Sequence, residues 1–491
     1  MSPNCLSIFN IKTNKFAASF LVLITSIFAT GSQANALPDL GSPDLVEYDT
    51  QTEKELGRAF TSTLHTHYNL YSDLETNAYI RELGHKLASH TGNNRNYSFY
   101  IIDDSSINAF AGPDGVIGIH TGLINATETE DELAAVIAHE ISHVTQNHLS
   151  RRYEYSSTQG SLNSIASLIA AILIGMHDPS AGMATLMGGM GYNLQQQLKN
   201  SRLHESEADA IGINLLHKTG YNPHAMGDFF GRLAKASQLD TFHVPEILRT
   251  HPVSDNRLAE AENRAQNLSI SQKNKPESYL SYIKMRLKRD QSNLLEYNPK
   301  KSTHNESEAC YQKTLETIKA KKSVPSCLKN ENNKPESLPI FTTALIESYT
   351  TRNKKLTTHE SDYLKKLIEF KLELHPNNPS IPIRYSRYLQ QTGDIQSAIK
   401  TLNNAESKLT YKYTLYQTLA ELYTQTKQES YVYLNLAKAY LEIGSVERSE
   451  YFAKRTKEMK IDNNNKIKQE ITLLEDKLNK LLKNKDKNAD N

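Results

Sequence analysis

The sequence predicts an α+β fold, in which a mostly helical domain with a small antiparallel sheet is followed by an all-α domain of helical repeats. Residues 37–268 combine amphipathic helical patterns with two short runs rich in β-forming residues. Residues 339–460 have a helical pattern throughout, with small residues at repeat-like spacing. A chain of 491 residues is long enough for two or three domains.

The charge composition argues against several classes of partner. The 56 Lys and Arg residues nearly balance the 55 Asp and Glu residues, so the chain has no strong net field. We therefore expect no nucleic-acid partner, and any charge-dependent chemistry must come from local clusters.

Residues 1–36 have the pattern of a cleavable signal peptide. Lys12 and Lys15 precede an apolar run from Phe16 to Ala29, and small residues follow at 34–36. The alternative is a membrane anchor, but a run of about 14 residues is shorter than the roughly 20 that span a bilayer. We expect export, with cleavage after residue 36.

Two cysteines, Cys310 and Cys327, follow the signal peptide. They lie in the polar, partly helical segment 269–338 that connects the two domains. An oxidising compartment favours a disulfide between them, and two unpaired thiols are the alternative.

Two runs at residues 97–102 and 108–119 predict the sheet. The second run contains Pro113-Asp114-Gly115, a typical turn sequence, so we expect neighbouring strands to be antiparallel. A helix is expected before the sheet, at about 74–90.

The clearest helix follows Thr127 and Thr129. Each has a glutamate three residues later, Glu130 or Glu132, which offers a capping box in either register. Its apolar stripe has helical spacing and consists of Leu133, Val136, Ile137, Ile141 and Val144.

Further helices are expected at 200–217 and 224–237. The apolar stretch 165–191 is interrupted at 177–179 and is too short to span a membrane. It is expected to form either mobile helices or a flap over a cleft, or to pack as ordinary core.

The central motif of the helix after Thr129 is His139-Glu140-Ile141-Ser142-His143. Two imidazoles one helical turn apart can reach one metal ion from the same face. Glu140 would then lie beside the ion without binding it, placed to take a proton from water and return one to a leaving amine. The alternative is an amphipathic helix with two surface histidines.

A second helix supplies acidic residues at matching spacing. Glu205 and Asp209 are four residues apart and share a helix face, whereas Glu207 points about 200° away from Glu205. We expect Glu205 to be the third ligand of one Zn2+ per chain, and Asp209 to orient a ligating histidine. His204 and Glu207 are expected to be surface residues.

These motifs resemble those of the zinc peptidases that include HtpX and the CAAX prenyl protease. The resemblance covers the leader, residues 45–265 and the repeats, and it implies a zincin-like peptidase domain at 37–268. It also implies that one strand lies beside the active-site cleft and pairs with extended substrate. The residues of that strand are Asn108, Ala109, Phe110 and Ala111.

The segment 249–257 is similar to a family segment whose histidine can cap the zinc ion. By this resemblance His251 is a fourth ligand that closes the site, or a donor to the transition state. Arg257 is a further site candidate.

The C-terminal half resembles tetratricopeptide repeats. Gly393, Ala398 and Ala405 have the expected spacing, and a plain helical bundle is the alternative. A second, degenerate copy would contain Leu436, Ala437, Tyr440, Gly444, Ser449 and Thr456. Residues 461–491 are expected to form a solvated, charged helical tail.

Together these features predict a periplasmic zinc endopeptidase. By resemblance, its partners are unfolded or misassembled exported proteins and the outer-membrane assembly machinery, and peripheral membrane association stays open. One alternative is a repeat-based chaperone or scaffold whose peptidase site is normally closed. Another is an integral-membrane peptidase, for which only the leader and 165–191 are sufficiently apolar.

Overall fold

The computed structural model describes residues 50–151, 194–239, 244–268, 279–290, 306–332, 338–352, 356–459 and 465–489. The expected signal peptide and the apolar stretch 165–191 lie outside these described residues. None of the described helices is both long enough and apolar enough to span a membrane.

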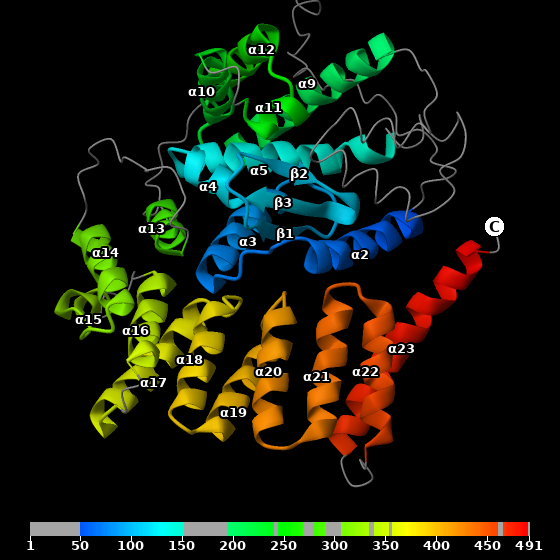
Figure 1. Ribbon diagram of the computed structural model, residues 1–491. Helices are drawn as coiled ribbons and strands as arrows, with labels where there is room; N and C mark the ends of the chain where they lie inside the picture. The colour runs from blue at the N-terminus through cyan, green and yellow to red at the C-terminus, as the bar shows by residue number, and fades with distance from the viewer. Residues whose placement is uncertain are drawn as a thin grey trace, which may run out of the picture. The chain divides into compact units, whose positions relative to one another are not determined.

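The first part of the chain is helical around one small sheet (Figure 1). Its helices are α2 (Thr50–His67), α3 (Leu74–Ala88), α4 (Thr121–Ala126), α5 (Glu130–Thr145), α9 (Leu194–Thr219), α10 (Ala225–Leu239), α11 (Glu246–Thr250) and α12 (Asp255–Gln266).

Local sequence fixes the starts of the helices that matter most for the site. Helix α5 begins after Thr129, whose side chain accepts a hydrogen bond from the backbone N–H of Glu132. The Glu132 carboxylate accepts from the N–H of Glu128 rather than from that of Thr129, so Thr129 caps the helix without the reciprocal bond of a capping box. Ser254 caps α12 in the same way.

The sheet contains β1 (Ser98–Ile102), β2 (Ala109–Ala111) and β3 (Val116–His120), in the order β1-β3-β2. Strands β2 and β3 form the expected antiparallel pair. The expectation of an all-antiparallel sheet is wrong, because β1 pairs with β3 in parallel. After β1 the chain passes to the opposite edge of the sheet and forms β2 there. It then turns back, so that β3 lies between β1 and β2 and runs in the same direction as β1.

The expected turn between β2 and β3 depends on left-handed backbone. Asp114 and Gly115 have φ angles of 53° and 73°. A side chain at Gly115 would collide with the backbone carbonyl of Asn96, so only glycine fits there.

Helix α5 forms the centre of the core. It lies between the sheet and helices α9 and α10 (Figure 1). The helix is buried on nearly every side. Its fully buried residues include Ala134, Ala135 and Ala138, whose small side chains allow neighbouring elements to approach closely.

The rest of the described chain is entirely helical. Its helices are α13 (Leu280–Asp290), α14 (Glu306–Lys319), α15 (Ser326–Asn332), α16 (Pro339–Thr351), α17 (Thr358–Leu374), α18 (Ser380–Gln391), α19 (Ile395–Glu406), α20 (Tyr413–Gln425), α21 (Glu429–Glu442), α22 (Val446–Glu458) and α23 (Asn465–Ala489).

The connecting region packs into the hydrophobic core that also contains the sheet and α5. Cys310 of α14 and Cys327 of α15 form the disulfide that the sequence favours. The rings of Tyr282, Tyr311 and Phe341 pack edge to face, with centroids 5.3–5.6 Å apart.

Helices α18 to α22 recur with a regular period. Helices α18, α20 and α22 begin at Ser380, Tyr413 and Val446, so successive starts are 33 residues apart. Gly393 and Lys427, which are 34 residues apart, both have positive φ in the following turns. The period of these helices is therefore 33–34 residues. Gly444, in the turn between α21 and α22, also has positive φ.

The expectation of a fully solvated C-terminal tail is wrong for one face of α23. Ile467, Ile471, Leu474 and Leu478 are buried against residues of α21 and α22. Their spacing of three to four residues places them on one stripe of the helix.

An ion cluster joins the sheet-containing part to the C-terminal helices. Arg286 of α13 is fully buried and its Nη2 lies 2.6 Å from Asp73 Oδ1, at the start of α3. Arg384 of α18 binds Glu75 of α3, and both guanidinium groups also contact Glu347 of α16. Burial raises the pKa of Asp73, but Arg286 and Arg384 hold it below its usual range.

We expect Arg286→Met to destabilise the chain by about 3–5 kcal/mol, because it leaves the buried carboxylate of Asp73 without its closest cation. Urea unfolding followed by circular dichroism measures this change. Arg455→Met is the matched control, since Arg455 is exposed, where its contacts with Glu458 and the Tyr433 ring contribute little, and should leave the transition nearly unmoved. Equal midpoints for the two variants would contradict the structural role of the cluster.

Candidate metal centre

Four side chains from three helical segments meet at one point. They are His139 and His143 of α5, Glu205 of α9, and His251 directly after α11. Each offers one ligand atom, and these atoms all lie within 4.8 Å of one another. This is the one such group among the described residues, and it includes every ligand candidate that the sequence suggests.

Close packing of two helices brings the carboxylate to the imidazoles. A side chain at Gly212 of α9 would press on Met226 and would lie 3.4 Å from the backbone nitrogen of His139. The absence of a side chain therefore lets α9 approach α5 at the height of its first histidine, within one helical turn of Asp209.

Backbone hydrogen bonds hold His251 in place. The N–H of His251 donates to the carbonyl of Ile247, at 2.8 Å, which closes the short helix α11. The N–H of Ile247 donates to the carbonyl of Ile107, at 3.0 Å, which ties α11 to the segment entering β2.

The distances between donor atoms fit a tetrahedral zinc site. The Nε2 atoms of His139 and His143 are 3.0 Å apart. Glu205 lies 3.3 Å from His139 and 3.5 Å from His143. The Nδ1 atom of His251 lies 3.3 Å from His139 Nε2 and 3.1 Å from Glu205 Oε2. Bonds of about 2.0–2.1 Å to one tetrahedral zinc ion separate its ligand atoms by about 3.3 Å.

Asp209 and Arg257 lie directly behind this group. Asp209 Oδ1 is 3.0 Å from the Nδ1 atom of His139, on the side of the ring away from the cluster. Arg257 donates two hydrogen bonds to Asp209, at 2.8 and 2.9 Å, and its Nη1 lies 3.2 Å from Glu205. The guanidinium group therefore holds both carboxylates in position.

The electrostatics of the group favour a bound cation. Burial lowers the pKa of His143 well below its ordinary value, which keeps the ring neutral. Burial also lowers the pKa of His139, but Asp209 and Glu205 raise it to about 10. Burial raises the pKa of Glu205, but His251 and His143 hold it well below its usual value. A cation that binds at Nε2 of His139 must displace a proton.

Glu140 is buried beside the group and only 1% exposed. Within the described residues neither of its carboxylate oxygens accepts a hydrogen bond of good geometry, and the nearest imidazole atom, His251 Nε2, is 3.4 Å away. Burial raises its pKa, whereas the nearby His251 and His139 lower it. A buried carboxyl group in this setting calls for a further polar partner such as water.

The expected substrate strand is β2, which forms one edge of the sheet. Among the described residues β2 pairs only with β3, so its other edge has no strand partner. Ala109 and Phe110 are buried and Ala111 is partly exposed. Asn108 is buried just before the strand, and its side-chain oxygen has no hydrogen bond among described groups.

The sequence does not identify His148, and it wrongly assigns Glu207 to the surface. The Nδ1 atom of His148 lies 2.8 Å from His143 Nδ1, and its Nε2 lies 3.0 Å from Glu207. Helical geometry correctly turns Glu207 away from Glu205 but does not show what it meets. His204 stacks on His148 with ring centroids 4.3 Å apart. The sequence signal that could have identified His148 is its position, five residues after His143.

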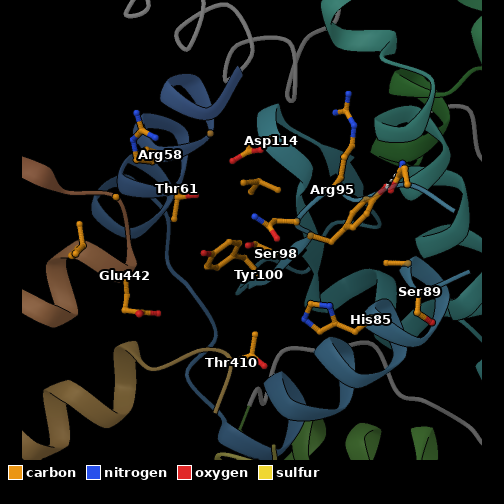
Figure 2. Close-up of a pocket in the computed structure, with 18 residues that line it drawn as sticks. Arg58, Thr61, His85, Ser89, Arg95, Ser98, Tyr100, Asp114, Thr410 and Glu442 are labelled. Carbon is orange, nitrogen blue, oxygen red and sulfur yellow. Dashed lines mark hydrogen bonds between the residues drawn. The ribbon is translucent and has the colours of Figure 1, made fainter. Parts of the chain in front are cut away.

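A separate cavity of about 640 Å³ lies between the sheet-containing part and the repeats. Figure 2 shows Arg58, Asp114 and Tyr100 of the sheet-containing part around it, together with Glu442 at the end of α21 and Thr410 from the turn between α19 and α20. None of its lining residues belongs to the four-residue cluster. The cavity is therefore distinct from the metal centre.

Comparisons with known proteins agree with the geometry. Residues 74–265 match the family model described as Peptidase family M48. The chain is 35% identical over 260 residues to the Beta-barrel assembly-enhancing protease of Escherichia coli, which covers 53% of each chain. It is 28% identical over 186 residues to Metalloprotease LoiP of Escherichia coli, covering 36% of this chain and 68% of LoiP.

A mitochondrial relative extends the comparison. Metalloendopeptidase OMA1 of Bos taurus is 30% identical over 166 residues, which covers 33% of this chain and 31% of OMA1. The chain spans about half the length of the assembly-enhancing proteases that it matches. Residues 74–265 are therefore similar to the Peptidase family M48, in agreement with the two sequence motifs.

We expect Glu205→Ala to lose bound metal, because it removes the one carboxylate among the four donor side chains. Atomic absorption on dialysed protein would show about one zinc per chain for the wild type and little for the variant. Glu260→Ala, a change of the same kind on the exposed face of α12, should retain the wild-type content. Full occupancy in Glu205→Ala would exclude Glu205 as a ligand.

Proposed function

We propose, from the premise that residues 74–265 form a Peptidase family M48 domain, that the chain is a zinc-dependent endopeptidase acting on misfolded or misassembled exported proteins. The observation that carries this proposal is the cluster of His139, His143, Glu205 and His251 with the buried carboxylate of Glu140 beside it. A metal-ligand group next to a buried acid that does not itself bind the metal is the arrangement that metal-dependent peptide hydrolysis requires.

His139, His143 and Glu205 would hold the zinc ion, and Asp209 would fix the ring of His139 through Nδ1. When bound, zinc would act as a Lewis acid toward water and the scissile carbonyl group. Glu140 is the general base in this proposal: it takes a proton from the attacking water and returns it to the leaving amine. Its burial keeps the carboxyl group away from bulk solvent until substrate arrives.

The edge of β2 would bind the substrate. An extended peptide can add to a strand that has an unpaired edge, and its backbone then forms hydrogen bonds that do not depend on its side chains. The residues concerned are Asn108, Ala109, Phe110 and Ala111. The proximity of β2 to α5 supports this assignment, since the backbone of Ala111 lowers the pKa of Glu140. Such binding suits unfolded chains of varied sequence.

His251 would act as a cap on the metal. Its Nδ1 atom is within 3.3 Å of His139 and Glu205, and its Nε2 faces Glu140. In this arrangement the ring fills both the fourth donor position and the space in front of the base. We therefore propose that the resting enzyme is closed and that His251 must move before hydrolysis.

The helical repeats would hold substrates or the outer-membrane assembly machinery. The 33-residue period of α18, α20 and α22 supports tetratricopeptide repeats, which bind polypeptides on their concave surfaces. The disulfide between Cys310 and Cys327 supports export to an oxidising compartment, which we take to be the periplasm. The relative's printed name, Beta-barrel assembly-enhancing protease, supports a role in outer-membrane protein quality control.

A second candidate function is a repeat-based chaperone or scaffold whose peptidase site is normally closed. The position of His251 inside the donor cluster favours it, because a closed site leaves binding as the resting activity. A Glu140→Gln chain that fully replaces the wild type in cells would support this alternative.

We expect Glu140→Gln to reduce casein cleavage by roughly 10²–10⁴-fold in kcat, because the amide cannot accept the proton. Bound zinc should be unchanged, since Glu140 is not among the four donor residues. Cleavage at the wild-type rate would refute the assigned role.

We expect His251→Ala to increase casein cleavage while metal content is retained, because three donors remain and the fourth position becomes available. Initial rates at equal zinc content measure the effect. A lower kcat would contradict the cap and would favour a role for His251 as a transition-state donor.

A further inference from the structure

We propose that His148 and Glu207 form a hydrogen-bonded relay that orients the metal-binding ring of His143. This inference rests on the proposed zinc site and assigns positioning roles to two residues that the sequence analysis leaves without a role in it. It would give His143 the same kind of support that Asp209 gives His139.

The contacts are continuous from carboxylate to metal ligand. Glu207 Oε2 lies 3.0 Å from His148 Nε2, and His148 Nδ1 lies 2.8 Å from His143 Nδ1. The Nε2 atom of His143 then faces the other donor atoms, 3.0 Å from His139 Nε2. Both nitrogens of each ring thus take part in one continuous chain of contacts from Glu207 to the metal position.

Only one arrangement of protons satisfies every contact. A neutral His143 with Nε2 turned toward the metal carries its proton on Nδ1 and donates it to Nδ1 of His148. His148 must then carry its own proton on Nε2, which donates to the carboxylate of Glu207. The carboxylate of Glu207 therefore determines which nitrogen carries the proton in each ring. The Nε2 atom of His143 is left without a proton and can donate its lone pair to the metal.

The two rings of the relay are largely buried, and the side chain of Glu207 is 18% exposed. His148 is 3% exposed, and the side chain of His143 is 11% exposed. Hydrogen bonds in such surroundings are stronger than exposed ones, and the loss of one partner leaves a buried polar group unsatisfied. Arg151 lies 3.0 Å from the same oxygen of Glu207 and balances its charge.

The backbone after α5 is shaped to place His148. The helix ends at Thr145, and Asn147 adopts a left-handed conformation with φ of 54°, which turns the chain back toward α9. The guanidinium group of Arg95 binds the Asn147 side chain and also Glu53 of α2, at 2.7 Å. This turn is therefore fixed on both sides.

With the relay, the three acidic residues at 205–209 of α9 each have a different role. Glu205 faces the metal position, Asp209 supports His139, and Glu207 supports His143 through His148. A guanidinium group stands behind each supporting acid, Arg257 for Asp209 and Arg151 for Glu207. The two imidazoles of α5 thus have equivalent support from opposite sides of α9.

The test is the affinity of the purified chain for Zn2+, measured by competition with a chromophoric chelator. We expect His148→Phe and Glu207→Gln each to weaken binding by roughly 10–100-fold, the usual effect of losing a group that orients a ligand. His148→Asn should recover part of this loss, because its amide oxygen can replace Nδ1 as the acceptor for His143. His204→Phe, which keeps the ring stacked on His148 but lies outside the relay, should bind as the wild type does.

Thermal unfolding of the metal-free variants shows whether His148 orients the ring of His143 or only stabilises the fold around it. Equal zinc affinity in His148→Phe and the wild type would overturn the relay. The relay would also be overturned if His148→Asn bound zinc no better than His148→Phe and both metal-free variants unfolded at lower temperature. Failure of the wild type itself to bind zinc would instead refute the proposed function, so the two failures are distinguishable.

Discussion

The balance of buried charge at the metal centre is the constraint on which the rest of the structure depends. Three carboxylates, those of Glu140, Glu205 and Asp209, are at most 6% exposed, and Arg257 is the one guanidinium group among them. Ionised acids cannot remain in a dry site without compensating charge. Burial raises the pKa of Glu140, and although burial lowers the pKa of His139, Asp209 and Glu205 raise it to about 10, so the described groups can hold protons that a bound cation would displace. The donor atoms and the buried charge of the site therefore both favour a bound cation.

The junction between the two parts of the chain shows the opposite case. Asp73, Glu75 and Glu347 are also buried or nearly so, but three guanidinium groups contact them. These belong to Arg286, Arg289 and Arg384. Each of these carboxylates has a guanidinium partner, and the partly exposed Asp290 also pairs with Arg289, so the cluster acts as a rigid connection. The same physical rule thus marks one cluster as structural and the other as a binding site.

Signals that are local in sequence predict much of this organisation. The capping residues before α5 fix where the helix begins, and the four-residue spacings of His139 with His143 and of Glu205 with Asp209 fix which side chains share a face. Features that depend on distant pairing are missed. The order of the strands, the pairing of Arg286 with Asp73 and the buried stripe of α23 each need a neighbour that the local pattern does not contain.

The position of His148 shows why some of the site could not be predicted. Its approach to His143 depends on one left-handed residue, Asn147, and on an arginine some fifty positions earlier in the chain. The left-handed conformation of Asn147 and its contact with Arg95 do not follow from the helical spacing of the metal motif. Spacing along a helix predicts which residues point together, whereas a turn outside the helix decides what the remaining side chains meet.

Within the proposed function, substrate binding and release of His251 depend on the same stretch of backbone. The carbonyl of Ile107 accepts the hydrogen bond that anchors α11, and the candidate substrate strand begins at the next residue, Asn108. A peptide that adds to β2 would therefore press on the segment that holds the cap. Because His251 follows α11 directly, a small shift of that five-residue helix moves the ring away from Glu140 without disturbing α5 or α9. Such an arrangement would keep the enzyme closed until an extended chain occupies the edge of the sheet.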